Sequence, residues 1–388
     1  MKALCWNGAG ELRVERVPDP AILAPQDVVI KVSLSSASGA DLPLIDGHAP
    51  GLGPGDILGH EFLGEVVEKG PEVLRLNRGD RVVTIPVLAC GKCWHCRQED
   101  YALCDNSNPD PGCEERAYGH AAAGILGCGR ASGGYAGGHA EYVRVPFADH
   151  NCFRVPEGVG DAQAVFVSDT VPTGFMAADM AGIRPGDVVA VWGCGGLGQM
   201  AARSARLLGA ERVVAIDRHP GRLRAAQEKA GAEPLDGTRV DVCDALLAMS
   251  GGRGPDVCID AAGPAAGSGA EGWFDRKRQA LGLDAGRPAV LHQMIRSCRK
   301  GGTLSIAGLR GGTVDGFPIG AAMAKGLTLR MGRQRGQRYV GRLFERIGGG
   351  ELDPSYLMTH QWPLDDAPRG YRMFKEQRDR CLRVVFAP

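Results

Sequence analysis

Residues 188–217 read VVAVWGCGGLGQMAARSARLLGAERVVAID, and this stretch decides the fold of half the chain. The apolar run 188–192 is typical of a parallel strand that is buried on both faces. A glycine-rich turn follows and opens a helical stretch that we expect to end at Leu208. Strand, G-x-G-G-x-G turn and helix in this order predict a dinucleotide-binding βαβ unit that holds a pyrophosphate at the helix N-terminus. The predicted loop contacts are Gly193, Gly195, Gly196, Leu197 and Gly198.

Asp217 ends the next predicted strand, about twenty residues beyond the loop, where such folds carry an acidic residue. A carboxylate there can accept hydrogen bonds from both ribose hydroxyls and repels a 2′-phosphate. This favours NAD over NADP. Arg218 follows directly and works against that preference, and Arg222 is a further candidate for cofactor binding.

The chain has 388 residues, more than one hydrophobic core usually supports, so we expect two domains. Short strand candidates separated by Gly and Pro turns favour a barrel-like β domain at the N-terminal end; they lie at 28–34, 58–67, 82–86 and 140–145. From about residue 185, strands and helices alternate, which predicts an α/β doubly wound parallel sheet. The expected elements are strands at 188–192, 213–216, 256–261 and 303–307 and a helix at 221–230.

We assign residues 1–164 and 334–388 to the β-rich domain and residues 165–333 to the nucleotide-binding domain. The tail is expected to contain a helix at 339–347 and a strand at 382–386 and to rejoin the first domain. The polar, Gly-rich stretch 264–290 interrupts the strand–helix rhythm. We expect a long loop there, over the cofactor; a disordered surface insertion is the alternative.

Four cysteines lie within fifteen residues with the spacing C-x2-C-x2-C-x7-C: Cys90, Cys93, Cys96 and Cys104. Four thiolates at this spacing can close a tetrahedral shell around zinc with no open position, which is typical of a structural site. We therefore predict a structural zinc lobe at about residues 88–106. An iron–sulfur cluster and four unliganded thiols are the alternatives.

Composition excludes several classes of function. Lys plus Arg and Asp plus Glu both number 45, so no net charge attracts nucleic acid or an anionic membrane. No apolar run approaches the ~18–20 residues that a membrane helix needs. The first twenty residues lack the apolar core of a signal peptide. With 13 cysteines, of which only one group is clustered, we expect a reducing compartment, the cytoplasm.

The cysteine cluster, the Gly59-His60-Glu61 triplet and the dinucleotide loop occur here in one chain. In this order they resemble the zinc-containing medium-chain alcohol dehydrogenase family, and most closely its glutathione-independent formaldehyde dehydrogenase branch. Segments similar to that branch run along essentially the whole chain, among them DILGHEFLGEVVEKG, GGYAGGHAEYVRVP, FVSDTVPTGF and CRKGGTLSIAG. The resemblance implies a GroES-like β domain, a Rossmann domain and a homodimer or homotetramer that acts on a small-molecule substrate.

In that family the catalytic zinc is held by a Cys, the His of the GHE triplet and a third residue, which is an Asp in this branch. His60 and Asp169 match these ligands, and Glu61 is placed to approach the metal from behind. For His60 a hydrogen-bonded core histidine is the alternative, and for Asp169 a helix N-cap. The resemblance also places Thr173 near the nicotinamide and Arg333 near the cofactor phosphates or an acidic substrate. A simple helix start is the alternative for Thr173, and a solvated arginine is the alternative for Arg333.

The catalytic motif departs from the family at three positions. The family reads roughly I-C-G-S-D-L-H where this chain has residues 37–43, ASGADLP. Ser38 replaces the cysteine ligand, Ala40 replaces the hydroxyl that starts the proton relay, and Pro43 replaces the His that often ends it. A neutral hydroxyl is a poor zinc ligand, although Ser38 is equally interpretable as a plain turn residue.

Three functional hypotheses follow. The first is an NAD-linked oxidoreductase that moves hydride to or from a small alcohol or carbonyl, or an activated C=C or C=N, with its catalytic zinc weak or absent; Ser38, His60 and Asp169 then orient substrate or move protons. The second is a conventional zinc alcohol or aldehyde dehydrogenase with a shell rebuilt from His60, Asp169 and Glu61. The third is an NAD-binding protein without redox turnover.

Overall fold

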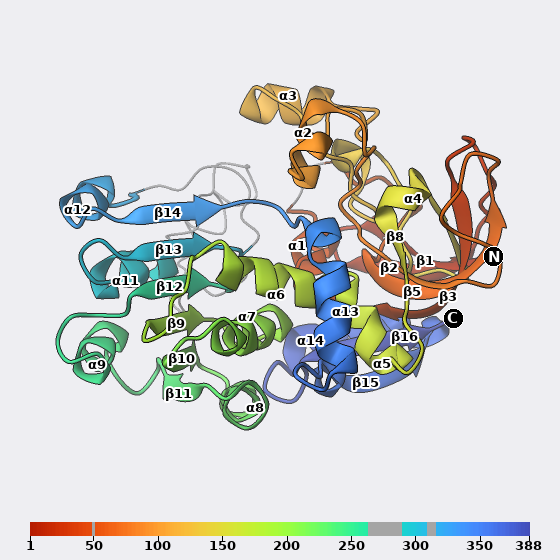
Figure 1. Cartoon of the computed structure of the whole chain (residues 1–388). Coiled ribbons are helices and arrows are strands. Elements are labelled where there is room, and N and C mark those ends of the chain that lie inside the picture. Colours follow the sequence, from red (N-terminus) through yellow and green to blue (C-terminus); the bar gives the residue numbers. More distant parts are fainter. Residues whose placement is uncertain (49–50, 263–288, 309–315) are drawn as a thin grey trace. The chain divides into compact units, whose positions relative to one another are not determined.

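A computed structural model describes residues 1–48, 51–262, 289–308 and 316–388 (Figure 1). Its contacts divide the chain into two compact units. Unit 1 comprises Met1–Pro172 with Gln334–Pro388, and unit 2 comprises Thr173–Arg333. Of the predicted loop 264–290, all but the last two residues lie outside the described residues. The prediction was wrong for those two, since Ala289 and Val290 begin helix α11 (Ala289–Ser297) and belong to its regular backbone.

Unit 2 is built on a six-stranded parallel sheet with the strand order β11-β10-β9-β12-β13-β14 (Figure 1). Counted along the chain this is 3-2-1-4-5-6, the order of dinucleotide-binding folds, so the predicted doubly wound sheet is confirmed. The strands are β9 (Val188–Trp192), β10 (Arg212–Asp217), β11 (Glu233–Asp236), β12 (Val257–Asp260), β13 (Thr303–Ile306) and β14 (Thr328–Met331).

Alternate side chains of β9 serve two different cores. Val189 and Val191 pack with the alanines of α7 (Gly196–Leu207) and α8 (Pro220–Ala230). Ala190 and Trp192 pack on the opposite face, with residues of α9 (Val242–Met249) and α11. Burial on both faces explains why the strand reads as a continuous apolar run. Among the described residues of this unit, the remaining helix is α12 (Ile319–Ala324), and α6 (Thr170–Asp179) carries the chain in from unit 1.

Unit 1 contains two β-sheets. The smaller has the order β2-β1-β4, and the larger has the order β15-β16-β3-β5-β6-β8, with β7 also paired to β3. All pairings are antiparallel except β15 with β16. The strands are β1 (Lys2–Gly8), β2 (Glu11–Arg16), β3 (Val28–Ser36), β4 (Asp56–Ile57), β5 (Glu61–Lys69), β6 (Arg81–Thr84), β7 (Tyr142–Val145), β8 (Cys152–Arg154), β15 (Met358–Pro363) and β16 (Arg383–Ala387).

The C-terminal segment completes the larger sheet of unit 1. Phe386 of β16 pairs with Ser35 of β3. Helix α14 (Ala367–Glu376) packs its Tyr371 and Phe374 against Phe386. The other helices of this unit are α1 (Asp41–Ile45), α2 (Trp94–Arg97), α3 (Gly112–Tyr118), α4 (Ala148–Asn151), α5 (Asp161–Ala164) and α13 (Val340–Gly348). Among the described residues, no helix is both long and apolar enough to span a bilayer.

One strand starts later than the sequence predicts. We expected a strand from Leu58, but β5 begins at Glu61. Gly59 adopts φ +99°, outside the range of an extended strand, and a Cβ at this position would lie 2.5 Å from the ring of His139. The glycine therefore makes a bend that leaves room for the ring of His139, and the strand starts only after this bend.

Candidate functional site

The four predicted cysteines converge in unit 1. One donor atom from each of Cys90, Cys93, Cys96 and Cys104 lies within 4.8 Å of all the others. Cys93 caps the N-terminus of α2, where its sulfur accepts a hydrogen bond from the backbone N–H of Cys96. Cys90 Sγ accepts from the backbone N–H of Cys93 and from Asn106 Nδ2, at 3.4 and 3.3 Å.

This donor set fits a structural zinc ion. Two of the sulfur–sulfur distances, Cys90 to Cys96 and Cys93 to Cys104, are 4.0 Å. Zinc–sulfur bonds of about 2.3 Å in a tetrahedron require sulfurs roughly 3.8 Å apart. Burial raises the pKa of Cys90, but N–H donors around the sulfur outweigh it and hold this pKa at about 7. Burial raises the pKa of Cys96 and Cys104. The fit therefore rests on the convergence of the four sulfurs, and zinc there would be fully coordinated by protein.

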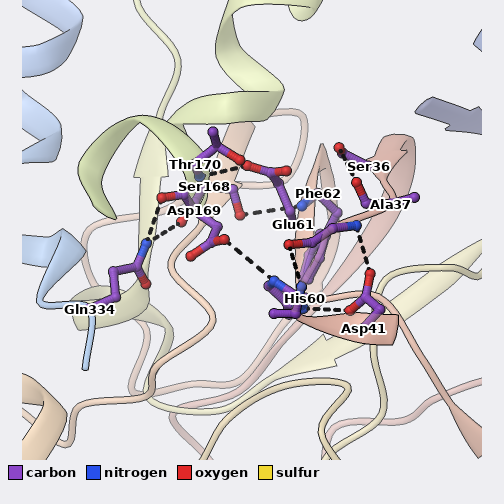
Figure 2. Close-up of polar contacts among 12 residues, drawn as sticks. Ser36, Ala37, Asp41, His60, Glu61, Phe62, Ser168, Asp169, Thr170 and Gln334 are labelled. Atoms are coloured by element: carbon purple, nitrogen blue, oxygen red, sulfur yellow. Dashed lines mark hydrogen bonds and ion pairs between the residues drawn. The ribbon is translucent and has the colours of Figure 1, made fainter. Parts of the chain in front are cut away.

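The second cluster of predicted residues lies at the bend before β5. His60 stands between two carboxylates: its Nδ1 is 2.9 Å from Asp41 Oδ1, and its Nε2 is 3.4 Å from Asp169 Oδ2 (Figure 2). Asp41 is the first residue of α1, and Asp169 directly precedes α6. The side chains of His60 and Asp41 are 7% and 0% exposed, whereas that of Asp169 is 20% exposed. Asp169 is therefore the member of the cluster that solvent reaches.

The two carboxylates set the charge of the imidazole. Burial by itself would lower the pKa of His60, but the charge of Asp41 and the hydrogen bonds to Asp169 and Asp41 outweigh it and raise this pKa well above 6.5. Burial would likewise raise the pKa of Asp41, yet His60 lowers it to about 2. The pair is accordingly an imidazolium facing a carboxylate. In this form His60 carries a proton that it can donate.

Glu61 contacts Thr170 and Arg383, which weakens the hypothesis that it is a ligand in a rebuilt metal shell. Its Oε1 accepts a hydrogen bond from the backbone N–H of Thr170 at 2.7 Å (Figure 2). Its Oε2 is 3.6 Å from Arg383 Nε. Arg383 also donates to Thr170 Oγ1 at 2.9 Å. Burial raises the pKa of Glu61 to about 7, against the opposing charge of Arg383. Glu61 thus ties β5 to α6 and β16.

Ser38 takes part in the turn before α1. Its backbone N–H donates to Asp41 Oδ2 at 2.7 Å, and its Oγ accepts from the backbone N–H of Ala40 at 3.3 Å. The residue is 4% exposed. These bonds are those of a turn residue, which was one of the two interpretations of Ser38 from the sequence.

This second site offers fewer protein ligands than a catalytic zinc ion usually has. Catalytic zinc needs about three protein ligands, and His60 with Asp169 supplies two. Glu61 is bound to Thr170 and Arg383, and the Ser38 hydroxyl is neutral. Within the part of the chain that the structure describes, the four-cysteine lobe is the only cluster of three or more His, Cys, Asp or Glu donors at metal-binding separation.

Sequence reasoning did not find several residues of this cluster. Gln334 Nε2 donates to the backbone oxygens of Ser168 and Asp169, both at 3.2 Å. Asp41, Tyr371, His139 and Arg383 complete the surroundings of His60 and Glu61. Asp41 was the one with a local signal, since it lies within the altered motif 37–43; the others come from distant parts of the chain.

The dinucleotide loop in unit 2 has the geometry that its glycines predict. Gly193 has φ +88°, and a Cβ there would lie 2.9 Å from Ala261 O. A Cβ on Gly198 would lie 1.7 Å from Gly193 O, so only glycine lets α7 start this close to β9. A Cβ on Gly195 would meet nothing nearer than Arg222 Nη1 at 3.7 Å. Gly195 therefore faces open space at the N-terminus of α7, where a pyrophosphate would approach.

Asp217 supports this loop directly. Its carboxylate accepts three backbone hydrogen bonds, from Cys194 at 2.6 Å, Arg218 at 2.7 Å and His219 at 3.0 Å. A carboxylate offers about four acceptor positions, so part of its capacity remains for a ribose hydroxyl. Unit 2 also contains the other predicted cofactor residues: Thr173 on α6, Gly196 and Leu197 on α7, Arg222 on α8, and Arg333 after β14.

Comparisons with known proteins agree with both units. A family model described as "Alcohol dehydrogenase GroES-like domain" matches residues 24–157, and one described as "Zinc-binding dehydrogenase" matches residues 196–269. A zinc-type alcohol dehydrogenase-like protein of Bacillus subtilis is 36% identical over 390 residues, covering 100% of both chains. The chain belongs to the zinc-type alcohol dehydrogenase family.

Other members of the family are similar along almost their whole length. The glutathione-independent formaldehyde dehydrogenase of Pseudomonas aeruginosa is 32% identical, over 96% of this chain and 94% of its own. Alcohol dehydrogenase TADH from Thermus sp. ATN1 has a TM-score of 0.85 and 31% identity, over 100% of this chain and 99% of its own. The predicted family, its GroES-like domain and the oxidoreductase class are thereby confirmed.

We predict that the cysteine lobe is a zinc site on which unit 1 depends. Replacing Cys96 with Ser removes one thiolate from a closed shell, so the variant should lose about one zinc per chain. Losing a structural metal should cost more than about 4 kcal/mol of stability. Elemental analysis and thermal unfolding measure the two effects. Cys381→Ser, which changes a buried thiol outside the lobe, is the control, and retention of all zinc by Cys96→Ser would contradict the assignment.

Two glycines of the loop should respond differently to the same substitution. Gly198→Ala forces a methyl group against a backbone oxygen and should destabilise the protein by roughly 1–3 kcal/mol or more. Gly195→Ala has room in the free protein and should unfold like the wild type, yet it should weaken NADH binding at least about tenfold. Thermal unfolding and NADH fluorescence titration separate the outcomes. Equal behaviour of the two variants would disprove the predicted loop geometry.

Proposed function

We propose that this protein is an NAD(H)-dependent oxidoreductase that transfers hydride to or from a small alcohol or carbonyl, or an activated C=C or C=N, without a tightly bound catalytic zinc. The observation that carries the proposal is His60, a buried imidazolium between Asp41 and the partly exposed Asp169. Asp217, whose charge repels a 2′-phosphate, supports NAD as the cofactor.

The chemistry divides between cofactor and protein. When bound, the nicotinamide supplies or accepts the hydride. In the reducing direction the carbonyl carbon gains that hydride, and the oxygen must gain a proton. His60 donates this proton and Asp41 stabilises its charged form, while Asp169 orients the substrate hydroxyl or carbonyl. In the oxidising direction His60 must first release its proton to solvent, and the neutral imidazole then accepts the proton of the alcohol as hydride leaves the carbon for the oxidised nicotinamide.

One observation favours a second candidate, the zinc dehydrogenase with a rebuilt shell. The 3.4 Å between His60 Nε2 and Asp169 Oδ2 matches two ligands of a tetrahedral ion with bonds of about 2.0–2.1 Å, which lie roughly 3.3 Å apart. A zinc ion at this site would lack a third protein ligand, because Glu61 is bound to Thr170 and Arg383. A non-catalytic NAD-binding protein is the third candidate.

We further propose that the protein works in the cytoplasm as a homodimer or homotetramer. The family resemblance supports the oligomer. So does strand β14, which lies at the edge of the unit 2 sheet and carries the exposed Met331. Sedimentation at several protein concentrations measures the oligomeric state.

Replacing His60 tests the proposed chemistry. His60→Ala should reduce kcat/KM by about 100-fold or more, because it removes the proton donor and its charge. NADH binding should be unchanged, since the dinucleotide loop is untouched. The assay follows NADH at 340 nm with a panel of small alcohols, aldehydes and ketones, and NADPH is titrated alongside to measure cofactor preference.

The control is His360→Ala, which changes a half-buried histidine on β15, outside the His60 cluster. Wild-type turnover with an unaffected His60→Ala variant would refute the role of His60. Wild-type NADH binding with no product from any substrate would favour the non-catalytic candidate.

A further inference from the structure

Behind the Asp41–His60 pair lies a chain of buried polar side chains that the proposed chemistry does not use. Tyr371 OH donates to Asp41 Oδ2 at 2.6 Å and lies 2.6 Å from His139 Nε2. His139 Nδ1 is hydrogen-bonded to Ser35 Oγ. All four of these side chains belong to residues that are 3% exposed or less. They come from α1, α14, the bend before β7, and β3.

The direction of every hydrogen bond in this chain can be worked out. Tyr371 OH is the donor to Asp41 Oδ2, and a hydroxyl has only one proton to donate. The single hydroxyl proton of Tyr371 therefore points to Asp41. The contact between Tyr371 and His139 must then be donated by His139 Nε2–H.

The state of His139 follows from its surroundings. Burial lowers its pKa to about 4, with the charge of Asp41 opposing and that of His60 adding to this effect, so the ring is neutral. A neutral imidazole with its proton on Nε2 has an acceptor at Nδ1, and this acceptor receives the Ser35 hydroxyl proton. Ser35, His139 and Tyr371 thus donate in sequence toward the one carboxylate.

The orientation of Asp41 depends on this arrangement. Its Oδ2 is held by two donors, Tyr371 OH at 2.6 Å and the backbone N–H of Ser38 at 2.7 Å. The other oxygen, Oδ1, is thereby left facing His60 Nδ1 at 2.9 Å. The His139 ring is fixed in turn, by the Gly59 bend on one side and by an edge contact with Phe386 on the other.

We propose that Tyr371 and His139 are positioning residues, which set the orientation of Asp41 and through it the ring and proton position of His60. This proposal rests on the proposed role of His60 and deepens it. Neither residue is assigned a part in substrate contact. Loss of the Tyr371 hydroxyl leaves Asp41 Oδ2 with one donor fewer, so the carboxylate can rotate and His60 loses its fixed partner.

The kinetic test uses single-atom and conservative changes. Tyr371→Phe should lower kcat by about 10- to 100-fold, the usual effect of removing an outer-shell partner, while KM and the NADH dissociation constant stay nearly constant. His139→Leu should lower kcat similarly. His139→Gln should restore most of it, because an amide offers both a donor and an acceptor. Tyr135→Phe, which removes another tyrosine hydrogen bond in unit 1, at 2.8 Å to Ser107 O, is the matched control.

Wild-type kcat in Tyr371→Phe, or equal losses in the Gln and Leu variants of His139, would overturn the proposal. A second measurement does not depend on turnover. Long-range ¹H–¹⁵N spectra of the full-length protein with labelled histidines report the proton position of each ring. We expect His139 as the neutral Nε2–H tautomer and a change in the His60 signals in Tyr371→Phe. A His139 ring that is cationic, or neutral with its proton on Nδ1, would overturn the proposed chain of donors even if the protein turned over no substrate. If His139 has its proton on Nε2 but the protein turns over no substrate, only the proposed function is rejected.

Discussion

Two of the fully buried carboxylates of unit 1 belong to the candidate site, and the contacts around that site compensate their burial. Asp41 and Glu61 are both 0% exposed. An isolated buried carboxylate is costly unless it is paired and hydrogen-bonded. His60 compensates Asp41, and Arg383 compensates Glu61 from 3.6 Å. Arg383 belongs to β16 and Tyr371 to α14, so the return of the C-terminal segment to the first sheet supplies both the cation and the hydroxyl that this site requires.

The need to pair buried polar groups also distinguishes the cysteine lobe from the His60 cluster, the two places where the family pattern predicts a metal. In the cysteine lobe, four soft donors converge and backbone N–H groups point at their sulfurs. Around His60 the donors are hard and already committed, to Thr170, to Arg383 and to one another. In the proposed function, the serine at position 38 belongs to a site in which His60 is paired with carboxylates of the protein.

The sequence predicted best what is encoded locally. The glycines of 193–198 and the apolar run before them fix a turn and a buried strand by their own sterics, and the doubly wound sheet followed from them. The cysteine lobe was equally readable, since its spacing alone brings the four thiols together. The partners of Glu61 could not be predicted, because no local pattern near residue 61 indicates a contact with Arg383. Tyr371 and Asp41 meet across 330 residues, through packing of α14 that no local pattern encodes. The strand expected from Leu58 began at Glu61 because His139, from another segment, occupies the space beside Gly59.

The central claim is that the protein carries one tightly bound zinc, in the cysteine lobe, and that the His60 site works without one. The most direct test is elemental analysis of zinc in wild-type protein purified without chelators and dialysed against metal-free buffer. The account predicts about one zinc per chain, from one closed tetrahedral shell. About two per chain, surviving dialysis, would mean that His60 and Asp169 hold a metal after all and would contradict it.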